Sequence, residues 1–174
     1  MRSALTAIVV SAALALGGCS LGAGSMLGLG HGIGPVVHDP YMALAAADDL
    51  YEIEAANVAL DKAQRPEVRG FAAMVREEHT RTAAQMTRLA EHIGLAPPNP
   101  VLSAEQARMI ATLQAASPAS FDAVYLSQQI DAHTSAYWLH RRYALDGDEK
   151  KLRTIAANAS FWAHDRLDRA KRLD

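Results

Sequence analysis

The 174-residue sequence has one cysteine, 6% aromatic residues and no surplus of charge of either sign. A single thiol excludes an intramolecular disulfide and the paired cysteines of a CxxC motif. Seventeen basic side chains stand against 19 acidic ones, which gives a formal net charge of −2. Without a basic patch interleaved with aromatics, the sequence predicts no nucleic-acid partner. A phosphate-binding glycine loop and a Ser-His-Asp order are also missing, so no catalytic residue is predicted.

A long hydrophobic run is missing as well. An apolar or small-residue stretch covers Ala4 to Leu16, which is 13 residues, whereas a helix that crosses a bilayer needs ~20. The stretch follows Arg2 and has the length of the hydrophobic region of a signal peptide. We therefore expect the protein to be exported.

The only cysteine, Cys19, lies just after this stretch. Leu-Gly-Gly precedes it, which resembles a bacterial lipobox. The sequence predicts that residues 1–18 are a lipoprotein signal peptide and that lipid on Cys19 anchors the protein to the bilayer, since several acyl chains make a stable anchor. The alternative is an ordinary secretory signal with an incidental cysteine. Ser20, in place of an aspartate, favours the periplasmic face of the outer membrane.

Composition divides the rest of the chain in two. Residues 19–39 are rich in glycine and follow neither a helical nor a strand period, which is typical of a flexible tether. From Pro40 glycine becomes rare, and alanine, leucine and charged residues recur with a helical period. The sequence therefore predicts a lipidated tether over 19–39 and a single helical domain over 40–174.

Five helical segments follow from this period and from the proline, glycine and capping signals between them. They cover about 41–63, 66–93, 104–115, 119–145 and 149–173. Short turns join the first segment to the second and the fourth to the fifth, and a proline-rich link with the short third helix lies between these pairs. Two antiparallel hairpins joined by a long crossover predict an all-α, ferritin-like four-helix bundle with a short extra helix.

Two histidines interrupt the inward faces of this predicted bundle near mid-length, His79 on the second helix and His133 on the fourth. By helical angle, Glu78 flanks the inward stripe of the second helix. Glu54 flanks the stripe of the first helix, and Glu52 faces away from it. That stripe follows the helical spacing of mostly apolar side chains: Ala46, Leu50, Ile53, Asn57 and Leu60.

The remaining aromatic and histidine candidates are given structural roles. Tyr137, Trp138 and Trp162 are interpreted as core or helix-contact residues, and His164 as a surface residue.

Metal binding at the bundle centre is the main chemical alternative. Di-iron bundles use Glu-x-x-His on two helices, but neither histidine has a glutamate three residues before it. A di-iron oxidase is therefore not predicted. A single Zn, Fe, Cu or Ni ion on His79, His133 and Glu78, with Glu54 as a further candidate, stays open because imidazole suits these ions. The favoured interpretation is that both histidines are structural, and no cofactor is predicted.

Two stretches carry a resemblance to a known family. EIEAANVALDKAQRPEVRGFAAMVREEHT is similar to the signature of the bacterial domain-of-unknown-function 4142 family, and FDAVYLSQQIDAHTSA resembles its second motif. The matching positions are Glu52, Glu54, Pro66, Glu67, Val68, Phe71, Ala72, His79, Phe121, Tyr125, Leu126, Asp131 and His133. The sequence departs from the pattern at Ala55, Ala56 and Glu78. The resemblance implies an exported ferritin-like bundle, often described as an outer-membrane protein, and it brings no activity.

Two functions from different classes follow. The preferred one is a non-catalytic bundle, anchored in the cell envelope through Cys19. It would bind an envelope protein or a small ligand and serve envelope maintenance or stress tolerance. The alternative is a metal-binding or metal-dependent redox protein that uses the mid-bundle histidines and glutamates. An enzyme is not favoured, because the sequence has neither a Glu-x-x-His motif nor a nucleophile triad.

Overall fold

The computed structural model describes residues 36–174, which form five helices. They are α1 (His38–Lys62), α2 (Pro66–His92), α3 (Ala104–Ala115), α4 (Pro118–Asp146) and α5 (Lys150–Leu173). The prediction of an all-α bundle is confirmed. Cys19 and most of the predicted tether lie outside the described residues. Among residues 36–174, no helix combines the length and the hydropathy of a membrane span.

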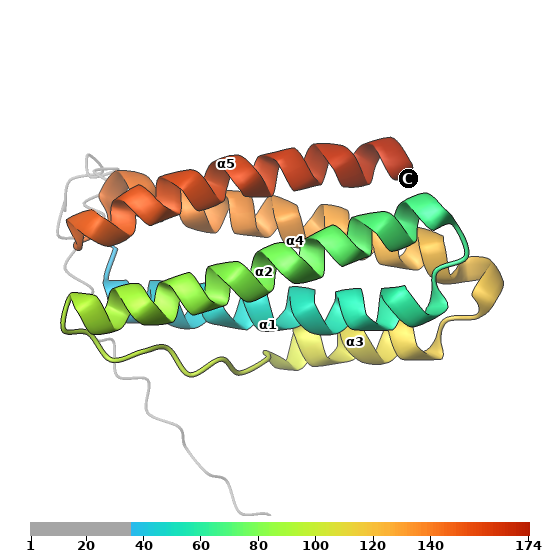
Figure 1. Cartoon of the computed structure of the whole chain (residues 1–174), viewed down its shortest axis with the longest axis horizontal. Coiled ribbons are helices and arrows are strands. Elements are labelled where there is room, and N and C mark those ends of the chain that lie inside the picture. Colours follow the sequence, from blue (N-terminus) through green and yellow to red (C-terminus); the bar gives the residue numbers. More distant parts are fainter. Residues whose placement is uncertain (1–35) are drawn as a thin grey trace, which may run out of the picture. The chain divides into compact units, whose positions relative to one another are not determined.

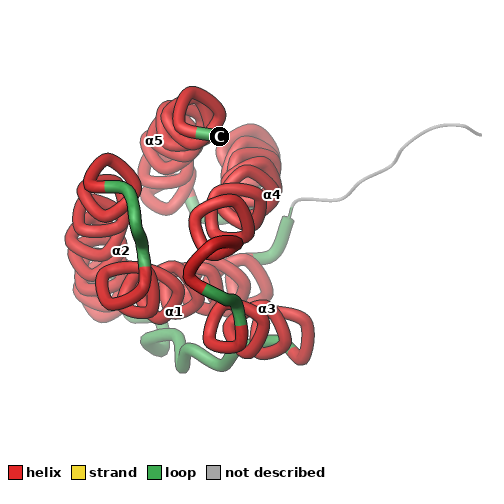
Figure 2. The backbone as a smooth tube through the Cα atoms, turned by 90° about the vertical axis from the view of Figure 1, so that its right-hand side faces the viewer, coloured by secondary structure: helices red, strands yellow, loops and turns green. Residues whose placement is uncertain are grey.

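Two hairpins lie side by side in the bundle. α1 packs on α2, α4 packs on α5, and the hairpins meet mainly through α1 and α4 (Figures 1 and 2). The short α3 covers α1 and α4 from outside. Its start is fixed as the sequence predicts: Ser103 and Gln106 each bond the other's backbone N–H in a capping box.

Helix α1 is central, because it contacts α2, α3 and α4. Of the predicted apolar stripe of this helix, only Ala46 is buried. Leu50, Ile53 and Leu60 are only half-buried and Asn57 is exposed, whereas the buried positions are mostly small: Ala45, Ala46, Ala47, Ala55, Ala56 and Ala59. A helix with three neighbours buries most of its circumference, and alanine lets the neighbouring backbones approach closely. The large aliphatic residues therefore mark the edge of the buried surface.

The tryptophans also differ from expectation. Trp138 and Trp162, which were interpreted as core or helix-contact residues, are 59% and 47% exposed, so neither belongs to the core. The buried face of α5 instead consists mostly of small residues and leucines: Leu152, Ala156, Ala163, Leu167 and Ala170. His164 is exposed, as predicted, and its Nδ1 lies 3.5 Å from Asp168 on the next turn.

The apolar core falls into two clusters along the bundle axis. One surrounds Phe71, Phe121 and Tyr125, and the other surrounds Tyr41 and Tyr143. Residues near the middle of α1, α2 and α4 separate them. The buried polar side chains occupy this middle region.

The chain enters the bundle against the turn between α4 and α5. The N–H of Val36 donates to the carbonyl of Asp146 over 2.8 Å, and the N–H of Asp148 donates to Val36 over 3.1 Å. The side chains of His38 and Asp148 also meet at 2.8 Å. α1 therefore begins two residues before the predicted domain boundary at Pro40, within the segment assigned to the tether.

Gly147 in this turn cannot accept a side chain. A Cβ there would lie 2.6 Å from both the ring and the carbonyl oxygen of Tyr143. That ring is stacked on Tyr41 with centroids 3.8 Å apart, so it has little room to move. We expect Gly147→Ala to lower the free energy of unfolding by about 1–3 kcal/mol, as measured by urea denaturation.

Gly70 provides the matched control. It lies within α2, and a Cβ there would meet nothing within 4 Å. Gly70→Ala should raise the free energy of unfolding by about 0.5–1 kcal/mol, because alanine is the better helix former. Equal denaturation midpoints for wild type and Gly147→Ala would contradict the steric argument.

Candidate metal centre

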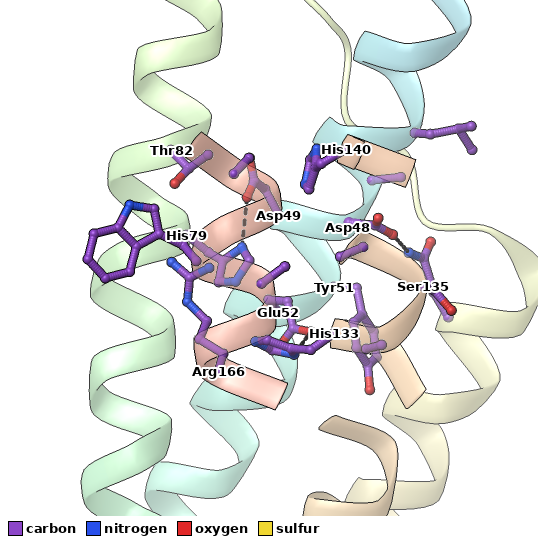
Figure 3. Close-up of a pocket in the computed structure, with 18 of the residues that line it drawn as sticks. Asp48, Asp49, Tyr51, Glu52, His79, Thr82, His133, Ser135, His140 and Arg166 are labelled. Atoms are coloured by element: carbon purple, nitrogen blue, oxygen red, sulfur yellow. Dashed lines mark hydrogen bonds and ion pairs between the residues drawn. The ribbon is translucent and has the colours of Figure 1, made fainter. Parts of the chain in front are cut away.

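Three helices bring buried polar side chains together at mid-bundle (Figure 3). α1 supplies Asp49 and Glu52, α2 supplies His79, and α4 supplies Gln129 and His133. All five are buried, with exposed fractions from 0% to 9%. Asp49 and Glu52 are three residues apart, which places both carboxylates on one face of α1. Buried polar side chains need partners, so the contacts among these groups decide what the cluster can do.

One ring nitrogen of each histidine has a partner. Nδ1 of His79 lies 2.7 Å from Oδ1 of Asp49. Nδ1 of His133 lies 3.1 Å from the carbonyl oxygen of Gln129 and 3.3 Å from Oε1 of Glu52. Because a carbonyl oxygen only accepts, Nδ1 of His133 carries a proton and donates it. In the neutral ring, Nε2 then presents a lone pair.

The second ring nitrogen of each histidine has no partner. Within the described residues, Nε2 of His79 and Nε2 of His133 are both enclosed by protein and make no hydrogen bond. The two rings lie edge to face, with centroids 5.9 Å apart. One potential ligand atom from each of Glu52, His79 and His133 lies within 4.8 Å of the others. Two imidazoles and a carboxylate thus converge on one small region.

Electrostatic interactions favour the charged form of the Glu52 carboxyl group. Burial alone would raise the pKa of this carboxyl group, but the charge and hydrogen bond of His133 outweigh it, and the pKa is lowered. The amide of Gln129 contributes by donating to Oε2 of Glu52 over 2.7 Å. For Asp49, burial dominates and raises the pKa, although the hydrogen bond and charge of His79 oppose this.

A cavity of about 750 Å³ lies beside the cluster. Residues from all five helices line it, and they include Asp49, Glu52, His79 and His133 of the cluster together with Asp48, His140, Trp162 and Arg166. Burial, and after it the charges of His79 and Arg166, lower the pKa of His140 to about 4. His140 is therefore a neutral imidazole near pH 7, and its Nδ1 lies 3.1 Å from the hydroxyl of Tyr41.

Comparison with known families places the chain. Residues 37–173 match the family described as a domain of unknown function, DUF4142. The chain belongs to the DUF4142 family. The resemblance seen in the two sequence motifs is thereby confirmed. No relative was found among the curated proteins.

Solved structures similar to this DUF4142 domain confirm the fold. CopM in its Cu(II)-bound form has a TM-score of 0.67 at 15% identity, over 79% of this chain and 95% of CopM. CopM co-crystallised with Ag gives 0.65 at 15% identity, over 79% and 94% of the two chains. A DUF305 fragment from Deinococcus radiodurans gives 0.67 at 16% identity, over 77% and 92%. At these identities the likeness shows the helical bundle alone.

The carboxylates around the histidines differ from those the sequence suggested. Glu52, which was expected to face away from the core, is 3% exposed and belongs to the cluster. Glu78 instead accepts a hydrogen bond from Nε of Arg166 at 2.7 Å. Glu54 is half-buried and does not line the cavity. Among the four predicted candidates, the structure brings together His79 and His133.

The sequence also missed Asp49 as the partner of His79. The usable signal was the pair Asp49 and Glu52, three residues apart in an alanine-rich helix. Two carboxylates on the small-residue face of a central helix point inward together. Choosing the inward face of α1 by its large aliphatic residues hid this signal.

Asp48 of the DUF4142 domain should make stability depend on pH. Burial, and then the nearby charges of Glu52 and Asp49, raise its pKa to about 7. The native state thus binds a proton that the unfolded chain releases near its ordinary pKa of 3.8. Stability from Asp48 is complete below about pH 4 and is lost as the pH rises to about 7.

The substitution Asp48→Asn removes this titration and keeps an oxygen for the amide of Gln106, which donates to Oδ1 of Asp48 over 2.9 Å. In chelated protein we expect the variant to be more stable than wild type by about 1–3 kcal/mol at pH 8, with the difference vanishing near pH 4. Urea denaturation at both pH values measures it. A difference that does not change with pH would contradict the raised pKa.

Proposed function

We propose that this DUF4142 domain binds one divalent transition-metal ion through His79, His133 and Glu52. The observation that carries the proposal is the pair of buried Nε2 atoms without hydrogen-bond partners, next to a buried carboxylate kept in its charged form. A polar atom enclosed by protein without a partner is costly. A metal ion would remove that cost at both histidines at once.

The surroundings of the histidines support the proposal. Metal-bound histidines usually donate their second N–H to a carboxylate or a backbone carbonyl, which fixes the tautomer and the orientation of the ring. His79 faces Asp49 and His133 faces the carbonyl of Gln129 in this way. A buried histidine with a purely structural role would form hydrogen bonds through both ring nitrogens. His79 and His133 each do so only through Nδ1.

The donor types indicate the ion. Two imidazole nitrogens and one carboxylate suit Cu²⁺, Zn²⁺, Fe²⁺ or Ni²⁺, with Cu²⁺ bound most tightly by the general order of affinity. The one cysteine of the chain lies outside residues 36–174, so no thiolate of the described part can make the site selective for soft monovalent ions. The similar structure of CopM in its Cu(II)-bound form adds support.

The metal-binding alternative is thus better supported than a bundle without chemistry. Three protein ligands would leave coordination positions for a further ligand of the ion. We infer that the domain captures or carries the ion in the cell envelope, and that a lipid on Cys19 attaches it to the outer membrane. The envelope location rests on the signal-like N-terminus alone.

Metal analysis of the full-length protein, purified without chelator and dialysed against Cu²⁺ or Zn²⁺, tests the proposal. We expect about one equivalent of metal in wild type and loss of most of it in His79→Gln and His133→Gln. Replacing a residue that only orients a metal ligand already lowers metal affinity by about 10–100-fold, so loss of a ligand itself should cost at least as much. His164→Gln is the matched control, because His164 is exposed and lies on α5. Equal metal content in all four proteins, or none in wild type, would refute the proposal.

A further inference from the structure

Arg166 on α5 is the one lysine or arginine among residues 36–174 that is buried and also lines the cavity. Its side chain is 8% exposed, and its Nε donates to Glu78 over 2.7 Å. Within the described part of the chain, Nη1 and Nη2 make no hydrogen bond, yet neither is fully enclosed by protein. The outer edge of the guanidinium therefore remains available to a ligand in the cavity.

This guanidinium lies next to the candidate metal centre. Figure 3 shows the side chain of Arg166 pointing toward His79. Its charge acts on both sides of the cluster, because it helps to lower the pKa of His140 and opposes the rise in the pKa of Asp49. A ligand atom on the metal and a second one on Arg166 could thus belong to one small molecule.

We propose that the cavity binds a small organic monoanion with a carboxylate-type head group, one oxygen on the metal ion and the other on the free Nη groups of Arg166. The inference rests on the proposed metal site. The fork of free Nη donors would hold one carboxylate oxygen through charge-assisted hydrogen bonds, and an open coordination position on the metal ion would accept the other. The volume of about 750 Å³ lies in the range of small-molecule sites.

Charge and shape restrict the ligand further. Asp48, Asp49, Glu52, Glu105 and Asp131 line the cavity, and Arg166 is its only lysine or arginine within residues 36–174. Arg166 and the proposed ion can therefore hold one carboxylate between them, whereas a polyanion would meet strong repulsion from the acidic lining. Ile155, Ala159 and Trp162 line the cavity from the same helix as Arg166, and they offer an apolar wall for the rest of an organic acid.

Azide titration of the Cu²⁺-loaded full-length protein tests this inference, with the azide-to-copper charge-transfer band as the readout and acetate as the competitor. The copper content is measured first in every sample. We expect a saturable azide band in wild type that acetate displaces. Arg166→Gln should weaken azide binding by about 10- to 100-fold while one equivalent of copper stays bound, since a hydrogen bond to a charged group is worth about 1.5–3 kcal/mol.

Three further variants separate anion binding from a structural role of Arg166. Arg166→Lys keeps a charge but loses the fork, so it should also weaken azide binding, and it serves if the glutamine variant does not fold. Glu78→Gln should bind azide at least as tightly as wild type, because the guanidinium keeps its free edge and loses its counter-charge. Arg169→Gln, at an exposed arginine that pairs with Asp165, should leave azide binding unchanged.

The outcomes distinguish the two proposals. Absence of bound copper refutes the metal site itself. Bound copper without a saturable azide band, or with equal azide affinity in wild type and both Arg166 variants, refutes the anion site and leaves the metal site standing. Loss of azide binding in Glu78→Gln as large as in Arg166→Gln would mean that the ion pair only holds the helices in place, which also refutes the anion site.

Discussion

Cu²⁺ at a free concentration about 1,000 times its dissociation constant is expected to raise the free energy of unfolding of the wild-type protein by about 4 kcal/mol. The gain arises because the ion binds the native cluster and not the unfolded chain, in which Glu52, His79 and His133 are far apart in sequence. His133→Ala should lose almost all of it. Chemical denaturation with chelator and with Cu²⁺ measures both values.

The same experiment separates a ligand from a structural histidine. A histidine that only holds its neighbours should cost about 1–3 kcal/mol when removed, whether or not metal is present. A ligand should cost much more in the presence of metal than in its absence. His164→Ala is the control and should match wild type under both conditions. A stability gap between wild type and His133→Ala that is the same with chelator and with Cu²⁺ would show that His133 is structural.

The position of the cluster gives the expected gain a structural basis. Glu52 and His79 belong to the α1–α2 hairpin, whereas His133 belongs to the α4–α5 hairpin. The hairpins meet mainly through α1 and α4, and α2 contacts α5 only lightly. An ion held by all three residues would cross-link the hairpins between the two apolar clusters. Its removal should therefore loosen the packing of the hairpins against each other.

The helices could be predicted from the sequence because their ends carry local signals. Pro66 and Pro118 lie in the first turns of α2 and α4, and Ser103 caps α3. Such signals act within a few residues, so they can be recognised in the sequence without the tertiary structure. The start of α1 was missed by a few residues, because Val36 is held by the distant turn at Gly147. That contact lies 111 positions away and has no local signal.

Half of the site could also be predicted. His79 and His133 stand out, since each occupies a position at which the helical period expects an apolar residue. The carboxylates could not be assigned, because α1 is surrounded by three helices and its buried face is built from alanine. The usual rule, that large aliphatic residues mark the inward face, fails on such a helix. Only the tertiary structure shows that Glu52 lies inside and that Glu78 is bound by Arg166.

Replacing Cys19 by serine is expected to abolish lipid attachment completely. The thiol is the only group in the predicted lipobox that can form the thioether with the lipid, and the chain has no second cysteine to replace it. We expect the Cys19→Ser protein to incorporate no labelled palmitate and to keep its first 18 residues, so that its mass is that of the full precursor. Metabolic labelling and mass spectrometry of the membrane fraction measure both effects.

A neighbouring substitution provides the control for this prediction. Ser20→Ala changes the residue after the cysteine and leaves the thiol in place, so this protein should be lipidated and should begin at Cys19. The bundle itself should be unaffected in both variants, because Cys19 lies 17 positions before Val36, where the described bundle begins. If Cys19→Ser is processed normally and released as a soluble protein, an ordinary signal peptidase acts on the chain and the cysteine is incidental.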